Sequence, residues 1–161
     1  MALRAVLLRE RGRHGTRGFT LLELMLTIVA ASILAAIAVT GYRRIVLRME
    51  VTRAISDIGD IQLAITKFDT NNTRLPDSLA DVGLGGRLDP WGNPYQYLNF
   101  EDTKKFKGAR KDRNLHPINT DFDLYSSGPD GRSVAPLTAK ASRDDIIRAN
   151  DGRFIGKAED Y

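Results

Sequence analysis

The sequence carries one long apolar run near its N-terminus, from Leu24 to Tyr42, without a formally charged side chain. As an α-helix its 19 residues are about 28 Å long, close to the thickness of a bilayer's hydrocarbon core. A helix buried in the core of a soluble domain is usually shorter. The run therefore predicts a membrane-spanning helix, which leaves one domain of ordinary size for the rest of the chain.

The formal net charge of +4 is concentrated before this run. Residues 1–18 contain one acid, Glu10, and five arginines: Arg4, Arg9, Arg11, Arg13 and Arg17. The positive-inside rule keeps this stretch in the cytoplasm and sends the C-terminal part across the membrane. Because acids and bases balance over residues 19–161, no basic patch requires a nucleic acid as partner.

The composition argues against an enzyme. The chain has no cysteine and two histidines, which excludes disulfides, thiolate metal sites and cysteine nucleophiles. Neither His14 nor His116 pairs with a recognisable nucleophile, and no phosphate-binding loop is present. We therefore predict no catalytic residues.

Two fates of the apolar helix are open from its residues. The Ala36-Ile37-Ala38 pattern resembles a signal-peptidase site, which would release a lone secreted or membrane-tethered binding domain beginning at Val39. Alternatively, the helix is retained as an anchor. Glu23 favours retention, because a carboxylate at mid-bilayer costs about 2.5–3.5 kcal/mol and a discarded signal has no reason to carry it.

The segment Arg17-Gly18-Phe19-Thr20-Leu21-Leu22-Glu23 resembles the leader junction of the type IV pilin and pseudopilin family. The resemblance combines a short basic leader, a Gly-Phe junction, a glutamate five residues into the mature chain, and an apolar run. It implies that a prepilin peptidase cuts between Gly18 and Phe19 and that the new amine of Phe19 is methylated. The apolar helix then stays on the protein.

Glu23 requires a partner if it lies in lipid or in a packed helical core. The α-ammonium of Phe19 is a cation at similar depth, either in the same helix or in a neighbouring subunit. The alternative is that Glu23 extends to the membrane interface. The family resemblance favours the contact between subunits, where it would set the axial register of a filament.

Beyond Tyr42 the apolar residues follow helical spacing: Val51, Ile55, Ile58, Ile61, Ile65 and Phe68. They predict an amphipathic continuation of the same helix, over residues 19–68, packed on a globular domain. Three parts result: a cleaved basic leader (1–18), a transmembrane and filament-core helix (19–42), and a periplasmic globular domain (43–161).

The rest of the chain predicts an α+β, pilin-like fold. Residues 76–82 indicate a short capped helical turn closed by Gly83. Alternation over residues 95–98 and 122–125 predicts strands of a small antiparallel sheet packed on the helix. We expect the highly charged residues 101–116 to form a solvated loop between strands, and the C-terminal part to be an irregular loop.

Residues 89–95, Asp-Pro-Trp-Gly-Asn-Pro-Tyr, resemble a segment of the major pseudopilin of type II secretion systems. The prolines restrict the turn, and the single tryptophan is a large apolar anchor. By composition and by resemblance this segment is structural.

Residues 126–131, Ser-Ser-Gly-Pro-Asp-Gly, and the later Asp144-Asp145 resemble the calcium loop of the same pseudopilins. The resemblance implies a structural Ca²⁺ held by the following ligands: Ser127, Asp130, Asp144 and Asp145. Calcium prefers six to eight oxygen ligands. Asp121 and Asp123 are weaker candidates. From the residues alone, Asp130-Gly131 is equally a plain turn and Asp144-Asp145 a helix cap.

The function implied by the resemblance is a structural subunit of a periplasmic pseudopilus in a type II secretion system. Implied partners are further copies of the chain, other pseudopilins, the prepilin peptidase and methyltransferase, and an inner-membrane assembly platform with its ATPase. The predicted location is the inner membrane, with the C-terminal domain in the periplasm. The alternative is a type IV pilus subunit for adhesion, motility or DNA uptake.

Overall fold

The computed structural model describes residues 18–101 and 108–161. The chain divides into two units, residues 1–42 and 43–161, each described here by itself. Most of the predicted leader and residues 102–107 of the predicted 101–116 insertion lie outside the described residues.

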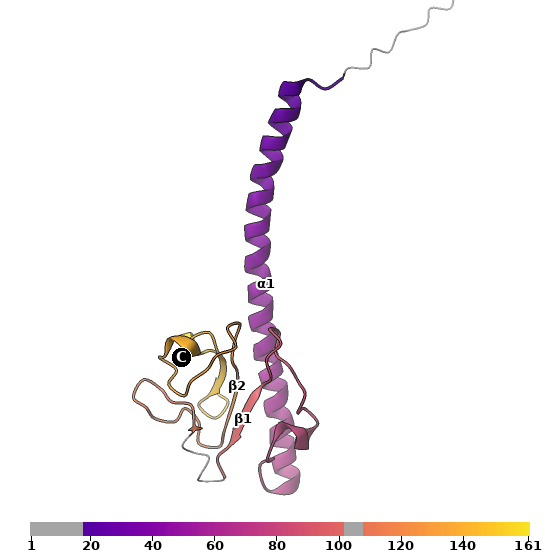
Figure 1. The fold of residues 1–161 in the computed structure, drawn as a ribbon. Helices are drawn as coiled ribbons and strands as arrows, with labels where there is room; N and C mark the ends of the chain where they lie inside the picture. The colour runs from indigo at the N-terminus through magenta and orange to yellow at the C-terminus, as the bar shows by residue number, and fades with distance from the viewer. Residues whose placement is uncertain (1–17, 102–107) are drawn as a thin grey trace, which may run out of the picture. The chain divides into compact units, whose positions relative to one another are not determined.

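The long helix α1 comprises Leu21–Asn72, close to the predicted 19–68 (Figure 1). Thr20 caps its start, since the Thr20 hydroxyl oxygen accepts a hydrogen bond from the Glu23 amide at 3.2 Å. The helix ends at Asn72, and Thr73 follows with a left-handed φ of 55°. In length and composition α1 is sufficient to cross a membrane, and all its residues up to Tyr42 are exposed in the isolated chain.

The second unit, residues 43–161, is called the soluble unit and contains a four-stranded antiparallel sheet in the order β1-β2-β3-β4. The strands are β1 (Gln96–Asn99), β2 (Phe122–Ser126), β3 (Ile146–Ala149) and β4 (Phe154–Lys157). In the described part of the chain they are accompanied by the short 3-10 helices η1 (Leu79–Val82), η3 (Lys140–Ser142) and η4 (Ala158–Asp160). The predicted α+β fold and its first two strands are confirmed. The predicted helical turn is also confirmed, and Gly83, which closes it, adopts the left-handed conformation.

The C-terminal part differs from the predicted irregular loop, because β3 and β4 pair as a hairpin. The connection comprises residues 150–153, in which Asn150, Asp151 and Gly152 all have positive φ angles. Asn-Asp-Gly sequences favour tight hairpin connections because these residues tolerate positive φ. Asp144-Asp145 therefore precede a strand, and the alternative of a helix cap at this position is wrong.

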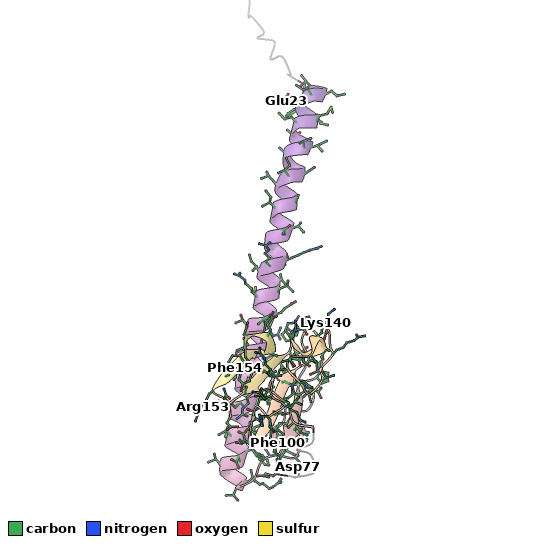
Figure 2. The ribbon with its side chains drawn as sticks, turned by 90° about the vertical axis from the view of Figure 1, so that its left-hand side faces the viewer. Glu23, Asp77, Phe100, Lys140, Arg153 and Phe154 are labelled. Carbon is green, nitrogen blue, oxygen red and sulfur yellow. The ribbon has the colours of Figure 1, made fainter. Side chains whose placement is uncertain are left out.

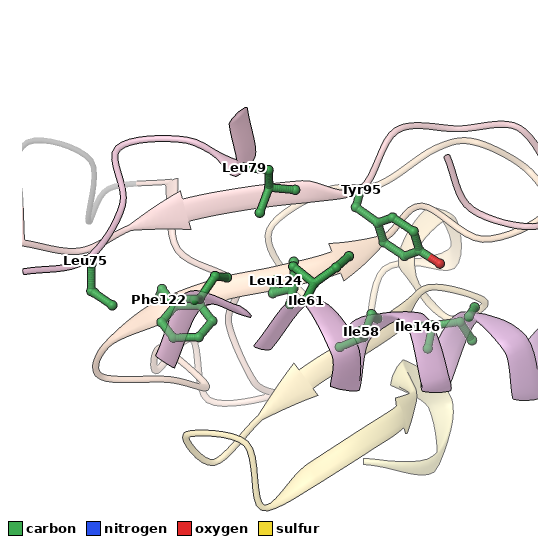
Figure 3. Packing of buried hydrophobic residues seen from close by; sticks show 10 residues of the cluster. Ile58, Ile61, Leu75, Leu79, Tyr95, Phe122, Leu124 and Ile146 are labelled. Carbon is green, nitrogen blue, oxygen red and sulfur yellow. The ribbon is translucent and has the colours of Figure 1, made fainter. Parts of the chain in front are cut away.

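The main core lies between α1 and the sheet (Figure 3). Ile58, Ile61 and Ile65 of the predicted stripe are fully buried there, and Val51 and Ile55 pack at its edge. They meet side chains from the loops and strands: Leu75, Leu79, Tyr95, Phe122, Leu124 and Ile146. Burial of this helical stripe fixes the amphipathic part of α1 to the sheet.

A second apolar cluster covers the other side of the sheet. It consists of Ile118, Leu137, Ile147, Ala149 and Ala158, with Tyr125 and Phe154 packed against it. Alternation along β2 explains the division, since Phe122 and Leu124 belong to the first cluster and Tyr125 to the second. The sheet is thus a middle layer between α1 and the loops of the C-terminal half.

Candidate functional site

The predicted cleavage junction lies just before α1. Gly18, Phe19 and Thr20 are outside the helix, and the Phe19 side chain is 77% exposed. A side chain added at Gly18 would meet no described atom within 4 Å. The backbone between Gly18 and Phe19 is therefore accessible in the isolated chain.

Glu23 lies in the first turn of α1 with its side chain exposed (Figure 2). A carboxylate at this position interacts favourably with the partial positive charge of the helix N-terminus. The residues Thr20 and Glu23 have the spacing of a capping box, and the half of it in which Thr20 accepts from the Glu23 amide is formed. The Thr-x-x-Glu spacing was the sequence signal for this cap, which the sequence analysis did not use.

The Asp-Pro-Trp-Gly-Asn segment is organised around the Asp89 carboxylate. One oxygen of Asp89 accepts hydrogen bonds from the amides of Trp91, at 3.0 Å, and Asn93, at 2.8 Å. The Trp91 indole N–H donates to Glu50 on α1 at 3.1 Å. The segment is therefore a turn anchored to the helix, in keeping with its predicted structural role.

The same turn is joined to the predicted calcium loop. The Ser126 hydroxyl donates to the second oxygen of Asp89 at 2.5 Å, and the Asn93 side-chain amide donates to the Gly128 carbonyl at 3.0 Å. The two segments that carry the resemblance in the soluble unit are thus neighbours in space.

The structure brings two of the four predicted ligands together. Gly128 has a φ of 64°, and a Cβ there would lie 2.5 Å from the Asp144 carbonyl oxygen, so only glycine allows this approach. The Asp130 amide lies 3.4 Å from an Asp144 carboxylate oxygen. The Asp130 carboxylate itself accepts a hydrogen bond from the Arg132 amide at 2.8 Å, and Ser127 is buried.

Asp145 has a different environment. Its side chain is completely buried, and one carboxylate oxygen accepts hydrogen bonds from the Ser133 hydroxyl, at 2.7 Å, and from the Arg110 guanidinium. Burial raises the pKa of Asp145, and the Ser133 hydrogen bond and the positive charge of Arg110 oppose this rise. The result of these contributions is a pKa raised to about 6. Asp145 and Arg110 form a buried ion pair.

The predicted calcium ligands therefore do not converge. Within residues 18–101 and 108–161, no three acidic, histidine or cysteine side chains are grouped so as to hold a metal ion. Calcium sites in proteins gather several oxygens around one point. The arrangement does not fit an ion shared by Asp130, Asp144 and Asp145.

The two weaker candidates also have protein partners. Asp123 is a buried residue of β2, and its carboxylate accepts hydrogen bonds from the Arg110 amide and from the Asn119 side chain. Burial raises the pKa of Asp123 above its ordinary value. Asp121 forms an ion pair with Arg148, at 2.6 Å.

Two buried arginines were missed by the sequence analysis. Arg148 in β3 donates to Gln62 of α1 at 2.9 Å and lies over the Phe122 ring, 3.9 Å from its centroid. Arg110 belongs to the charged stretch predicted to be solvated, yet it is 2% exposed. Arg110 lies in a charged stretch, whereas Arg148 lies between Ile147 and Ala149, and neither pattern by itself separates a buried arginine from one on the surface.

The N-terminal segment matches a known protein family. Residues 13–39 match the family described as the prokaryotic N-terminal methylation motif. This range contains the Gly18-Phe19 junction, Glu23 and most of the apolar run.

Curated relatives extend the similarity to most of the chain. Type II secretion system core protein G of Pseudomonas aeruginosa is 31% identical, with 74% of this chain and 88% of the relative covered. The protein of the same name from Escherichia coli is 30% identical, over 75% and 87%. A fimbrial protein of Neisseria meningitidis is 32% identical, over 84% and 80%. No solved structure matches significantly.

Proposed function

This chain belongs to the type IV pilin and pseudopilin family as a pseudopilus subunit of type II secretion, and from that premise we propose how it is processed, anchored and assembled. The observation that carries the assignment is its similarity, along most of its length, to core G proteins of type II secretion systems. A filament subunit acts through surfaces and needs no catalytic centre.

The precursor enters the inner membrane with its basic leader in the cytoplasm. A prepilin peptidase cuts between Gly18 and Phe19, and the Phe19 amine is methylated. The matched methylation motif and the accessible backbone at Gly18 support this step. Residues 19–42 then anchor the protein, and residues 43–161 lie in the periplasm, as expected from the arginines of the leader.

Assembly uses the exposed apolar part of α1. Large side chains there are more than half exposed in the single chain, among them Leu22, Met25 and Ile33. In lipid this surface is solvated by acyl chains, and in a filament it packs against other copies of α1. Other pseudopilins, an assembly platform and a partner ATPase complete the machine, the ATPase supplying the energy.

Glu23 gives the assembly its register. An unpaired carboxylate in the apolar filament core is costly, and the Phe19 ammonium of a neighbouring subunit removes that cost when the two helices are correctly staggered. The Thr20 hydroxyl already satisfies the Glu23 amide, so the carboxylate is not needed for that part of the helix cap.

The second candidate function is a surface pilus subunit. The similarity to the Neisseria meningitidis fimbrial protein favours it. The absence of cysteine from the sequence counts against a disulfide-closed C-terminal loop of a pilin. The two candidates are distinguished in a strain from which the gene has been deleted. Loss of reporter-enzyme secretion, restored by complementation, supports the first candidate. Loss of twitching or adhesion with normal secretion supports the second.

The role of Glu23 is tested in a deletion strain complemented with Glu23→Ala or Glu23→Gln. Both variants are expected to be cut at Gly18 but to reduce filament yield and export by more than about tenfold, the change that corresponds to losing about 1.4 kcal/mol. Asp77→Asn, at an exposed acid of the soluble unit, is the matched control and is expected to behave as wild type. Normal filament yield from Glu23→Gln would contradict the charge pairing.

A further inference from the structure

The most unusual group in the soluble unit is the guanidinium of Arg110. It comes from the charged stretch between β1 and β2, yet its side chain is almost fully buried on the sheet face opposite α1. A buried charge is expensive unless it is paired and hydrogen-bonded. Its partners therefore indicate what it is for.

The contacts of Arg110 join three segments that are distant in sequence. One terminal nitrogen donates to Asp145, just before β3, and the other donates to the hydroxyl of Ser133. The guanidinium carbon lies 4.3 Å from the centroid of the Tyr125 ring on β2. The Arg110 amide is held by Asp123 of the same strand. One cation thus connects the sheet, residues 131–134 and the start of the C-terminal hairpin.

A calcium ion and this guanidinium would compete for the same carboxylate. The paired oxygen of Asp145 already receives hydrogen bonds from Arg110 and Ser133. The second oxygen is buried and has no hydrogen-bond partner among the described residues. A divalent ion bound there would stand beside a fixed positive charge in a region of low dielectric, where repulsion between cations is strong.

We propose that the Arg110 guanidinium, held by Asp145, Ser133 and the Tyr125 ring, is the cation that fixes the C-terminal half of this chain in place of a calcium ion. Asp130 and Asp144 are left to shape the turn at Gly128, through the Asp130 amide and the Asp144 carbonyl. The stability of the soluble unit is then independent of calcium.

The decisive experiment uses the wild-type full chain in detergent micelles. Thermal unfolding is followed by the fluorescence of Trp91, the single tryptophan, which lies in the soluble unit. The Tm is expected to be the same within about 1 °C in a chelator and in about 1 mM CaCl₂, a concentration that fills weak extracellular calcium sites. Equilibrium dialysis with ⁴⁵Ca²⁺ is expected to show no saturable binding. A calcium-dependent rise in Tm, or one bound ion per chain, would overturn the proposal.

Variants test the arginine itself. Arg110→Met keeps much of the side-chain volume but leaves Asp145 without its cation, and is expected to lower the Tm by more than about 5 °C with or without calcium. Arg113→Met, at an exposed arginine three residues away, is the matched control and is expected to leave the Tm unchanged. Equal Tm values for the two variants would contradict the proposal.

A second variant covers the case in which Arg110→Met does not fold. Asp145→Asn removes the negative charge and keeps an oxygen that accepts from Ser133 and Arg110. It is expected to fold with a lower Tm that calcium does not change. A wild-type Tm for Asp145→Asn would show that the charge pair is not what holds this region.

Discussion

Single side chains decide how the loops of the soluble unit are attached to α1. Asp57 of α1 is buried and accepts hydrogen bonds from the Tyr95 hydroxyl, at 2.9 Å, and from Arg87. Burial and the neighbouring Asp57 raise the pKa of Tyr95 far above its ordinary value, so this hydroxyl remains a donor. The contact links the helix to the turn before β1 and is invisible in the sequence, where Asp57 is one acid among many.

Removing the hydroxyl of Tyr95 tests that contact. Tyr95→Phe leaves Asp57 with one hydrogen bond fewer in a buried position, and is expected to lower the free energy of unfolding by about 1–3 kcal/mol. The measurement is urea unfolding of the full chain in detergent, followed by Trp91 fluorescence. Tyr42→Phe, at an exposed tyrosine outside the soluble unit, serves as control. A loss shared by both variants would argue against a specific role of the Tyr95 hydroxyl.

Asp151 gives the fold an acid-sensitive contact. The hydrogen bond from the Thr120 amide lowers the pKa of Asp151 below its ordinary value of 3.8. Because the folded state binds this proton more weakly than the unfolded state does, the contribution is present above about pH 4 and is lost as the pH falls through the lowered pKa.

The free energy of unfolding of the wild type is expected to fall between about pH 5 and pH 2.5 as Asp151 becomes protonated. In Asp151→Asn this fall is expected to be smaller. Asparagine tolerates the positive φ of 55° at this position, so the hairpin is retained. Urea unfolding at several pH values provides the measurement, and Asp77→Asn the control. An unchanged slope of stability against pH in Asp151→Asn would contradict the assignment.

Among the secondary-structure elements, the sequence predicted the helix and strands whose apolar residues recur at a regular spacing. The stripe of α1 has helical spacing, and β1 and β2 alternate, so their existence and approximate bounds were predictable. β3 could not be predicted in this way, because all four of its residues are buried and its sequence shows no alternation of apolar and polar residues. The signal for the hairpin was the turn, Asn150-Asp151-Gly152, rather than the strands.

The stripe also makes a quantitative prediction. Ile61→Ala opens a cavity between α1 and the sheet and is expected to destabilise the soluble unit by about 2–5 kcal/mol. Leu63→Ala, two residues away on the same helix and 70% exposed, is the matched control and is expected to change stability little. Denaturant unfolding of both variants is the measurement. Similar losses would mean that the helix packs on the sheet through another face.

The candidate site was predictable where it depends on local sequence and unpredictable where it depends on tertiary contacts. The Gly18-Phe19 junction and Glu23 are adjacent in the chain, and the methylation-motif match includes them. The acidic loop is different, because the Asp145 carboxylate pairs with Arg110, which lies 35 positions earlier in the chain. Which of many arginines becomes buried follows from the packing of the loops, which no periodicity reports.

At the scale of the whole molecule, two requirements meet in one chain. The apolar part of α1 must be accepted by lipid and then by other copies of the same helix, whereas the soluble unit must fold by itself in water. In the proposed processing the leader separates these stages, because Phe19 would acquire a free amine only after cleavage. A subunit that begins elsewhere lacks the cation that we assign to Glu23.

Cleavage and methylation are read together from the intact mass of the mature protein purified from the membranes of a producing cell, with Gly18→Leu as an uncut control. The wild-type chain is expected to begin at Phe19 and to carry one added methyl group, and Gly18→Leu is expected to remain a full-length precursor. A wild-type chain that begins at Val39, or one that retains its leader, would contradict this expectation.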